Sequence, residues 1–253
     1  PEQKERLDGM RRGDYRLVYI APERFKASSF MDALKDVSIE MVAIDEAHCL
    51  SQWGHDFRPD YMRLGRALEA LGHPQCVALT ATATPIVRED IRKVLQLREP
   101  FENISGFERP NLSFTVTAVE RVAQKYARLQ KILKAHKTGI VYCATRKKVD
   151  EVAETIHSWG LKCVAYHGGM SDQEREDTQN TFISKKADIA VATNAFGMGI
   201  DRSDVRFVVH FEIPGSVEAY YQEAGRAGRD GEAAFCELLF NYADTRTQEF
   251  FIE

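Results

Sequence analysis

The stretch Met41-Val42-Ala43-Ile44-Asp45-Glu46-Ala47-His48 holds the pattern on which the fold depends, a short apolar run that ends in charged and polar side chains. Four apolar residues rich in valine and isoleucine, with little polar alternation, are typical of a strand that is buried on both faces. Six further runs along the chain share this character. They are residues 17–20, 76–79, 140–143, 163–166, 189–192 and 207–210.

Stretches with apolar residues at helical spacing separate these runs, as at residues 85–97, 121–136 and 147–159. Short buried strands that alternate with helices are typical of an α/β fold, in which mainly parallel sheets are flanked by helices. The helical pattern stops at residues 98–111, which hold two prolines and a glycine. We therefore expect two α/β lobes, residues 1–108 and residues 112–253. The first lobe shows only three or four strands, so we expect it to be small or incomplete at its front.

The composition is that of a soluble globular protein and excludes several other classes. The 253 residues are 44% apolar and 28% charged, with a net charge of −4, so any nucleic-acid site must be a local groove or loop. No apolar run approaches the ~18–20 residues of a membrane helix, and the charged start is not a signal peptide. The five cysteines are odd in number and form no C-x-x-C, which indicates a reducing compartment, no disulfides and no zinc site.

Asp45 and Glu46 directly follow a predicted strand and form the first candidate site. Side chains at the carboxyl end of a parallel strand face the crevice where ligands bind. An aspartate there can hold Mg²⁺ through water, and a neighbouring glutamate can polarise the water that attacks a γ-phosphate. The dipeptide is also common in acidic surface turns, so the pattern alone leaves both interpretations open.

The run from Gln222 to Gly231 is the second candidate site, because Arg226 and Arg229 lie three residues apart with glycines beside both. We expect the two arginines on one face of a helix or turn. The planar guanidinium suits phosphate oxygens, and one of the two could neutralise charge on a departing γ-phosphate. A solvated basic face is the alternative.

Two loops after predicted strands carry small or polar residues. In residues 194–201, the glycines allow close backbone contact with phosphate or ribose and Asp201 could accept a hydroxyl hydrogen bond, although a plain loop fits equally. In residues 80–84, the threonines could link two sites by hydrogen bonds. Thr84 could equally cap a helix that begins at Pro85.

Aromatic residues and an arginine interleave between His48 and Tyr61, where Gly54 and Pro59 disfavour a long helix. Such a loop suits stacking on unpaired bases. The alternative is a loop that packs its aromatic side chains into the core. Residues 19–25 end another predicted strand with a proline and a charged pair, which indicates either a contact with a nucleic-acid backbone or simple punctuation between strand and helix.

In this order, the segments resemble the RecQ family of superfamily 2 DNA helicases. The most specific part is the run 45–61, which resembles the family's motif II fused to its aromatic-rich loop. The remaining segments resemble other helicase motifs in turn: 19–25 the surroundings of motif Ib, 78–84 motif III, 140–146 motif IV, 190–201 motif V and 221–231 motif VI. The likeness covers almost the whole chain.

The resemblance implies two RecA-like lobes that clamp ATP and Mg²⁺, and a monomeric motor that moves 3′ to 5′ on single-stranded DNA and unwinds duplexes in DNA repair and recombination. It implies Asp45 on Mg²⁺ through water, Glu46 on the attacking water, and Arg229 as the preferred arginine finger. The implied catalytic residues are Asp45, Glu46, His48, Gln222, Arg226 and Arg229. Gly199 and Asp201 are implied to bind the cofactor. The implied DNA-binding residues are Pro22, Glu23, Arg24, Trp53, His55, Phe57, Arg58, Thr145, Arg146 and Thr193.

The sequence also departs from the family pattern. The phosphate-binding motif G-x-x-x-x-G-K-[ST] does not occur in it. We therefore expect a motor region truncated at its N-terminus, which alone binds ATP weakly and unwinds nothing, because that motif supplies most of the grip on the β,γ-phosphates. The family's zinc-binding and winged-helix modules usually follow the motor. The alternatives are a non-catalytic DNA-binding or regulatory module and an RNA helicase, and the loop around Trp53 favours DNA. A DNA motor would act in the bacterial nucleoid or the eukaryotic nucleus.

Overall fold

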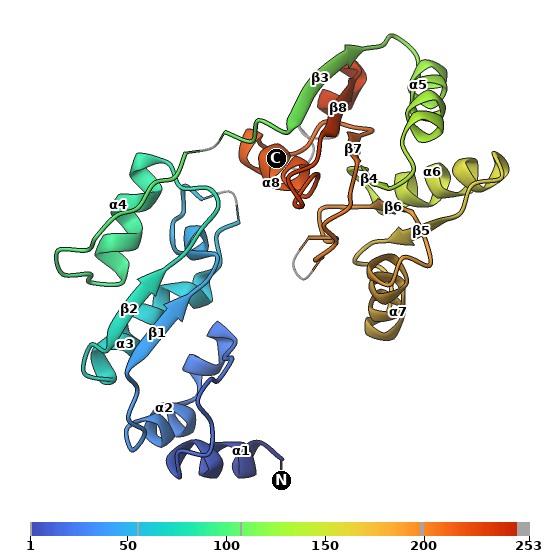
Figure 1. Cartoon of the computed structure of the whole chain (residues 1–253). Coiled ribbons are helices and arrows are strands. Elements are labelled where there is room, and N and C mark those ends of the chain that lie inside the picture. Colours follow the sequence, from blue (N-terminus) through green and yellow to red (C-terminus); the bar gives the residue numbers. More distant parts are fainter. Residues whose placement is uncertain (1, 55, 107, 198–199, 247–253) are drawn as a thin grey trace. The chain divides into compact units, whose positions relative to one another are not determined.

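The structure is a computed structural model that describes residues 2–54, 56–106, 108–197 and 200–246 (Figure 1). The chain divides into two compact units, Pro1–Ser105 and Gly106–Glu253.

Unit 1 is a small α/β unit in which two parallel strands are accompanied by helices. Its elements are α1 (Glu2–Arg11), η1 (Pro22–Lys26), α2 (Ser28–Leu34), β1 (Met41–Ile44), η2 (Ala47–Leu50), η3 (Pro59–Arg63), α3 (Leu64–Ala70), β2 (Gln75–Ala78) and α4 (Pro85–Val94), the η elements being 3-10 helices. β1 and β2 pair in register from Met41 with Gln75 to Ile44 with Ala78.

The prediction of a strand at residues 17–20 is wrong. The segment forms no strand, and the side chains of Leu17 and Tyr19 are 71% and 90% exposed. A strand persists only when a neighbour completes its ladder of hydrogen bonds. Among the described residues β1 and β2 pair only with each other, so apolar composition alone does not make this segment a strand.

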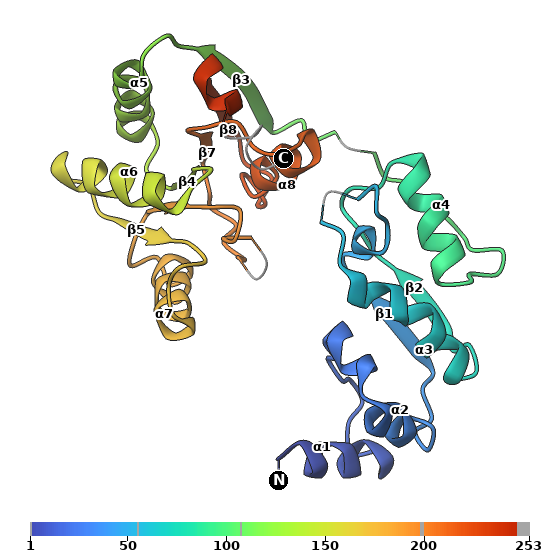
Figure 2. The same cartoon turned by 180° about the vertical axis from the view of Figure 1, so that it is seen from behind.

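The core of unit 1 lies on one face of its sheet. Ile44 packs there with Leu68 of α3 and Ile91 of α4. On the opposite face of β1, the side chains of Met41 and Ala43 are exposed in the part of the chain that the structure describes. Figure 2 shows α3 beside β1 and β2 from behind.

Unit 2 is built on a six-stranded parallel sheet with the order β3-β8-β7-β4-β6-β5. Its elements are β3 (Leu112–Ala118), α5 (Val122–Ala135), β4 (Gly139–Tyr142), α6 (Arg146–Ser158), β5 (Cys163–Tyr166), α7 (Asp172–Ile183), β6 (Ile189–Ala192), β7 (Phe207–His210), α8 (Val217–Ala224), β8 (Ala234–Phe240) and η4 (Tyr242–Asp244). The α/β fold with parallel sheets flanked by helices is thereby confirmed. The sequence patterns missed β3 and β8.

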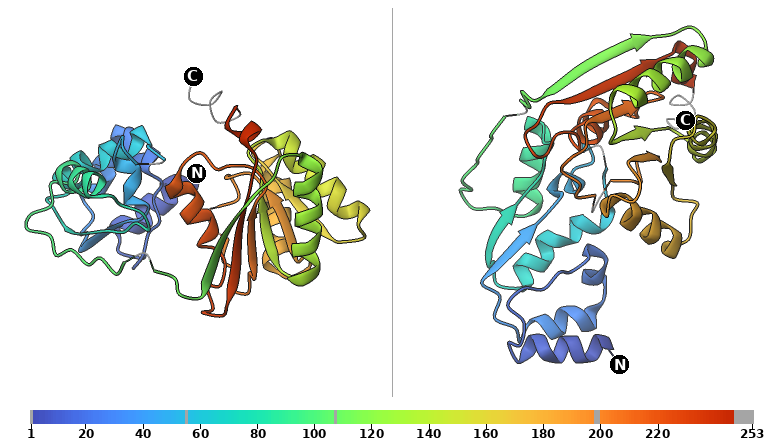
Figure 3. Two further views of the ribbon diagram at one scale, coloured as in Figure 1. Left: turned by 90° about the horizontal axis from the view of Figure 1, so that it is seen from above. Right: turned by 45° about the vertical axis from the view of Figure 1, so that its right-hand side comes forward.

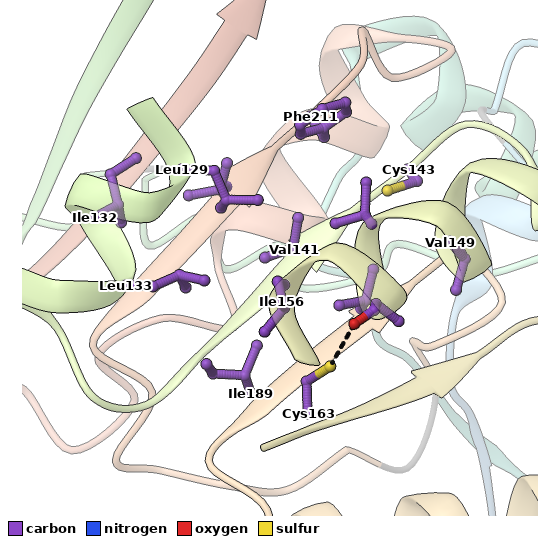
Figure 4. Packing of buried hydrophobic residues seen from close by; sticks show 14 of the residues in the cluster. Leu129, Ile132, Leu133, Val141, Cys143, Val149, Ile156, Cys163, Ile189 and Phe211 are labelled. Carbon is purple, nitrogen blue, oxygen red and sulfur yellow. Dashed lines mark hydrogen bonds between the residues drawn. The ribbon is translucent and has the colours of Figure 1, made fainter. Parts of the chain in front are cut away.

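The helices of unit 2 cover both faces of this sheet. On one face, α5 and α6 pack against side chains such as Val141 and Val191, and Figure 4 shows this core with Leu129 and Ile156 close to the strands. On the other face, α7 and α8 pack against side chains such as Ile140. The left view of Figure 3 shows α5 and α8 on opposite sides of the sheet. Successive side chains of a strand point to opposite faces of the sheet and are buried in one core or the other. The strands are therefore continuous apolar runs.

No helix among the described residues is long and apolar enough to span a membrane.

Candidate functional sites

Asp45 and Glu46 lie at the carboxyl end of β1, where the chain turns sharply into η2. The turn is made by Glu46, whose φ of 49° is in the left-handed region, and its backbone N–H donates to Asp45 Oδ1 at 2.8 Å. The next amide, of Ala47, donates to the carbonyl oxygen of Leu79 after β2. The Asp45 carboxylate is exposed, so the fold presents an acidic group at the edge of the sheet where the strands end.

His48 connects this acidic segment to the threonines after β2. Its buried ring places Nδ1 2.9 Å from Thr80 Oγ1 and 3.4 Å from a carboxylate oxygen of Glu46. The Thr80 hydroxyl donates to the carbonyl oxygen of Thr82, so it accepts from His48, which places the proton on Nδ1. Thr84 accepts the Val87 N–H and caps α4. The predicted helix cap at Thr84 is therefore confirmed, and the predicted link between two functional sites stays a prediction, although Thr80 does contact His48.

The aromatic loop after η2 is divided between solvent and core. The side chain of Trp53 is 75% exposed, whereas Tyr61 packs against the core of unit 1. Phe57 and Arg58 are half-buried, and the Arg58 guanidinium donates twice to Asp56 Oδ2, at 2.7 and 3.0 Å. His55 lies outside the described residues. Of the described members of this predicted set, Trp53 is the side chain most exposed to solvent.

Residues 22–24 form the start of a short 3-10 helix. Pro22 occupies its first position and Glu23 is exposed. The guanidinium carbon of Arg24 lies 5.3 Å from the centre of the Phe30 ring, a cation–π contact within unit 1. This contact accounts for Arg24 without a nucleic acid, so the segment's predicted role in DNA binding stays a prediction.

Arg226 and Arg229 of unit 2 follow α8, which ends at Ala224, and both hold the loop after β6. Arg226 donates to the carbonyl oxygen of Gly197 at 2.5 Å, and Arg229 donates to the carbonyl oxygen of Ile200 at 3.0 Å. Arg229 also lies 3.5 Å from a carboxylate oxygen of Asp201, whose side chain is 91% exposed. The two predicted segments of unit 2 are therefore brought together. Gly199 lies outside the described residues.

Two residues near the start of unit 2 form hydrogen bonds with the turn that carries Arg226 and Arg229. Arg109 donates to the carbonyl oxygens of Gly225, Ala227 and Gly228. Asn111 donates to the Gly228 carbonyl oxygen at 2.8 Å. Gly228 has a φ of 56°, and a Cβ there would lie 2.4 Å from the Asn111 amide nitrogen, so the turn requires glycine. Arg109 and Asn111 were missed in the sequence, because their partners lie more than 110 residues away.

A buried pair also lies beneath α8. His210 Nε2, at the end of β7, lies 2.8 Å from Glu223 Oε2, and both side chains are buried. The ring of His210 stacks against the ring of Tyr142. Gln222, the neighbour of Glu223, is half-buried. The pair positions the helix end that leads to Arg226, and no sequence motif indicated it.

A groove lies at the carboxyl ends of β4, β5 and β6. It brings together three predicted DNA-binding residues from two segments, Thr145, Arg146 and Thr193. The full lining is Ala144, Thr145, Arg146, Lys147, Gly168, Thr193, Asn194 and Ala195. Arg146 runs close to Gly169, where a Cβ would lie 3.2 Å from the guanidinium. Two cationic side chains beside small residues suit an extended anionic chain.

The rim of the groove is held by capping and by a half-buried acid. The Thr145 hydroxyl accepts the Lys148 N–H and caps α6. The Ala144 N–H donates to Glu212 Oε2 at 2.9 Å. Burial raises the pKa of the Glu212 carboxyl above its ordinary value. The backbone of residues 144–145 therefore has a fixed course along the groove.

Comparisons with known proteins agree with these two units. Residues 1–91 match the DEAD/DEAH box helicase family, and residues 124–231 match the helicase conserved C-terminal domain family. A structure of Dbp5 from S. cerevisiae bound to RNA and ADP BeF3 is similar in fold, with a TM-score of 0.67 and 22% identity over 88% of this chain and 60% of that chain. This likeness supports the RecA-like helicase fold.

Curated relatives are closer in sequence. The chain is 46% identical to the ATP-dependent DNA helicase RecQ of Bacillus subtilis over 253 residues. This match covers 98% of this chain and 42% of the relative. It is 42% identical to the RecQ helicase of Pasteurella multocida, over 96% of this chain and 38% of the relative. It is 41% identical to the ATP-dependent DNA helicase Q5 of Rattus norvegicus, over 99% of this chain and 28% of the relative. The chain thus spans less than half of each relative. Because the identity extends over almost all 253 residues, the chain belongs to the RecQ family of ATP-dependent DNA helicases.

Proposed function

We propose that the chain forms part of a motor that couples ATP hydrolysis to 3′-to-5′ translocation on single-stranded DNA and to duplex unwinding. One observation carries this proposal. A single stretch presents Asp45 and Glu46 at the end of β1, ties them through His48 to Thr80, and then presents the exposed ring of Trp53. An acidic site and a base-stacking side chain on one short segment suit a protein that links hydrolysis to DNA contact.

The acidic residues have the chemistry of a magnesium–nucleotide site. Mg²⁺ keeps several waters and needs only one or two protein carboxylates, which fits the exposed Asp45 at a strand end. Bound Mg²⁺ with ATP would supply charge neutralisation and the scissile phosphate bond. Glu46, half-buried and 3.4 Å from the His48 ring, would orient the attacking water. Through its contacts with both side chains, His48 would fix the position of Glu46 relative to Thr80.

Arg229 and Arg226 would bind phosphate oxygens of the nucleotide. Each arginine has a hydrogen bond to a carbonyl oxygen of the loop after β6, so nucleotide binding would exchange some of these contacts for phosphate oxygens. A guanidinium suits that exchange because it stays charged and has five donors. Arg229 is our preferred finger, with Asp201 positioned beside it and Gln222 sensing the nucleotide. Asp201 and Gly199 would line the nucleotide site.

The DNA would contact the groove of unit 2 and the loop of unit 1 that carries Trp53. Arg146 and Lys147 would face the phosphates, and the hydroxyls of Thr145 and Thr193 could donate to them. Trp53 would stack on a base, a contact worth ~1–3 kcal/mol. We expect the protein to act as a monomer. We expect it in the nucleoid of a bacterial cell or in the nucleus of a eukaryotic cell.

A hybrid helicase tests the proposal. In the Bacillus subtilis relative, the matching stretch is exchanged for residues 1–253 of this chain. We expect the hybrid to unwind a duplex with a 3′ single-stranded tail and to leave a 5′-tailed duplex intact. Glu46→Gln in the hybrid is the control and should abolish unwinding while DNA binding persists. Unwinding that survives Glu46→Gln would refute the catalytic assignment, and a hybrid that binds DNA without hydrolysing ATP would favour a non-catalytic module.

The chain by itself should behave differently. Because G-x-x-x-x-G-K-[ST] does not occur in its sequence, we expect the 253-residue polypeptide to release almost no phosphate from ATP. A malachite-green assay with single-stranded DNA measures this. Turnover near that of the Bacillus subtilis relative would refute the expectation.

A further inference from the structure

The loop that carries Trp53 has a defined shape at its base. The Gly54 N–H donates to the carbonyl oxygen of Ser51 at 3.0 Å. A Cβ at Gly54 would lie 2.3 Å from the His48 carbonyl oxygen, so the turn leaves room only for glycine. The backbone on either side of Trp53 is therefore closely folded onto the end of η2.

The ring of Trp53 is not held by packing, because its side chain is 75% exposed. Its backbone N–H donates to Ser51 Oγ at 3.1 Å. Ser51 is 1% exposed, so this acceptor is a fixed point in the interior of unit 1. The direction in which Trp53 leaves the surface therefore depends on the hydroxyl of Ser51.

That hydroxyl is oriented by a carboxylate on another element. Ser51 Oγ donates to Asp90 Oδ2 at 2.6 Å, a length typical of a charge-assisted O–H···O⁻ hydrogen bond. A hydroxyl has one hydrogen and two lone pairs. Because the Trp53 backbone N–H can only donate, the Ser51 oxygen accepts from it, and the single Ser51 hydrogen points to Asp90, which holds the hydroxyl in place.

Asp90 lies on α4, the helix that Thr84 caps. A second hydrogen bond, between His48 and Thr80, joins the same two segments of unit 1. Residues 80–90 thus contact the acidic segment through His48 and the aromatic loop through Ser51. A displacement of α4 would therefore disturb both the acidic segment and the aromatic loop.

We propose that Asp90 is a positioning residue for Trp53, acting through the Ser51 hydroxyl, and that it couples residues 80–90 to the contact with single-stranded DNA. The DNA part rests on the proposed function. The link between Asp90 and Trp53 does not, and it can be tested without DNA.

The first test measures the motion of Trp53 in the 253-residue chain with Trp159→Phe, which leaves one tryptophan. Time-resolved fluorescence anisotropy reports nanosecond motion of the ring. We expect Asp90→Ala and Ser51→Ala each to raise the amplitude of this motion about twofold, since a freed exposed side chain moves on this timescale. The double variant should add nothing further.

Two comparisons separate positioning from general loosening. Asp90→Asn keeps an acceptor oxygen and should stay near the parent, whereas alanine is a better helix former than aspartate, so Asp90→Ala does not weaken α4 itself. Thr84→Ala removes the cap of the same helix and is the matched control for its stability. Unchanged Trp53 motion in the two alanine variants would overturn the inference, as would an equal rise in Thr84→Ala.

The second test measures binding of fluorescein-labelled oligothymidine. Loss of one net hydrogen bond corresponds to about fivefold weaker binding, and we expect this of Asp90→Ala but not of Asp90→Asn. If Trp53 moves more freely in Asp90→Ala while Trp53→Ala binds DNA like the parent, the positioning link is supported and the proposed DNA contact of Trp53 is refuted. Parent-like affinity in Asp90→Ala alone would overturn the coupling to DNA.

Discussion

The imidazole of His210 and the carboxylate of Glu223 form a hydrogen bond of 2.8 Å in the interior of unit 2, between the end of β7 and the last turn of α8. His210 Nδ1 is buried and has no partner among the described residues. Because Nδ1 has no hydrogen-bond partner, the buried imidazole of His210 depends on the hydrogen bond that Nε2 makes with Glu223. The pair therefore fixes where α8 ends and where the chain towards Arg226 begins.

Removal of this pair should destabilise unit 2. We expect Glu223→Ala to lower the free energy of unfolding by about 2 kcal/mol, because it leaves a buried imidazole unpaired. Glu223→Gln keeps an acceptor oxygen and should lose less than half as much. Urea unfolding in a Trp53→Phe background measures this, since Trp159 then reports on unit 2 alone. Equal losses in the two variants would argue against the hydrogen bond.

Asp204 should make unit 2 sensitive to acid. Burial alone would raise its pKa, but hydrogen bonds from Arg202 and Lys185 outweigh burial and lower the pKa from 3.8 to about 2. A lowered pKa means that the carboxylate adds stability above pH 4, and that this stability is lost as pH falls from about 4 to 2. The urea midpoint of Asp204→Asn should lie below that of the parent at pH 6 and converge with it near pH 2. A gap that stays constant with pH would contradict this.

Arg202 should tolerate no replacement by lysine. Its buried guanidinium donates to the carbonyl oxygens of Phe182 and Ala187, contacts Asp204, and lies 4.6 Å from the centre of the Phe182 ring. Lysine cannot reproduce this fork of donors. We expect Arg202→Lys to lower the free energy of unfolding by about 3 kcal/mol. Arg175→Lys, at an exposed pair on α7, is the control and should change it by less than about 0.5 kcal/mol.

Trp53→Ala in the hybrid helicase should separate DNA contact from hydrolysis. We expect basal ATP hydrolysis to persist and its stimulation by single-stranded DNA to fall at least fivefold, from the loss of ~1–3 kcal/mol of stacking. Phosphate release at increasing oligothymidine concentration measures both. Stimulation equal to that of the parent would assign Trp53 another role.

Arg229→Ala in the hybrid should affect turnover far more than nucleotide affinity. A finger acts mainly in the transition state, and its loss lowers kcat by roughly 10³-fold or more. The change in kcat is compared with the change in the ATP dissociation constant, which is measured separately with a fluorescent nucleotide. An equal loss in both would show that Arg229 binds the ground state.

The sequence predicted those parts of the fold that depend on local patterns. Runs such as residues 140–143 and 189–192 are continuous because helices cover both faces of the sheet. β3 was missed because it is an edge strand with exposed side chains such as Phe114, and residues 17–20 were overpredicted because strand formation needs a partner that composition does not show.

The candidate sites divide in the same way. The cap at Thr84 followed from a hydroxyl side chain just before a proline at the start of a helix. The roles of Asp90, Arg109 and Glu223 did not, because each contact joins segments that are distant in the chain. Common polar residues without a motif gain their meaning only from the partner that the fold supplies.

The pairing of β3 with β8 has a consequence for folding during translation. Seven residues near residue 115 align with seven near residue 237, so a growing polypeptide must hold the first of these strands unpaired until more than 100 further residues have left the ribosome. During that interval the exposed backbone edge of β3 is open to wrong partners, and unit 2 closes its sheet only at the last step. A pause or a break late in translation would therefore leave the earliest strand of unit 2 as the segment most prone to aggregate.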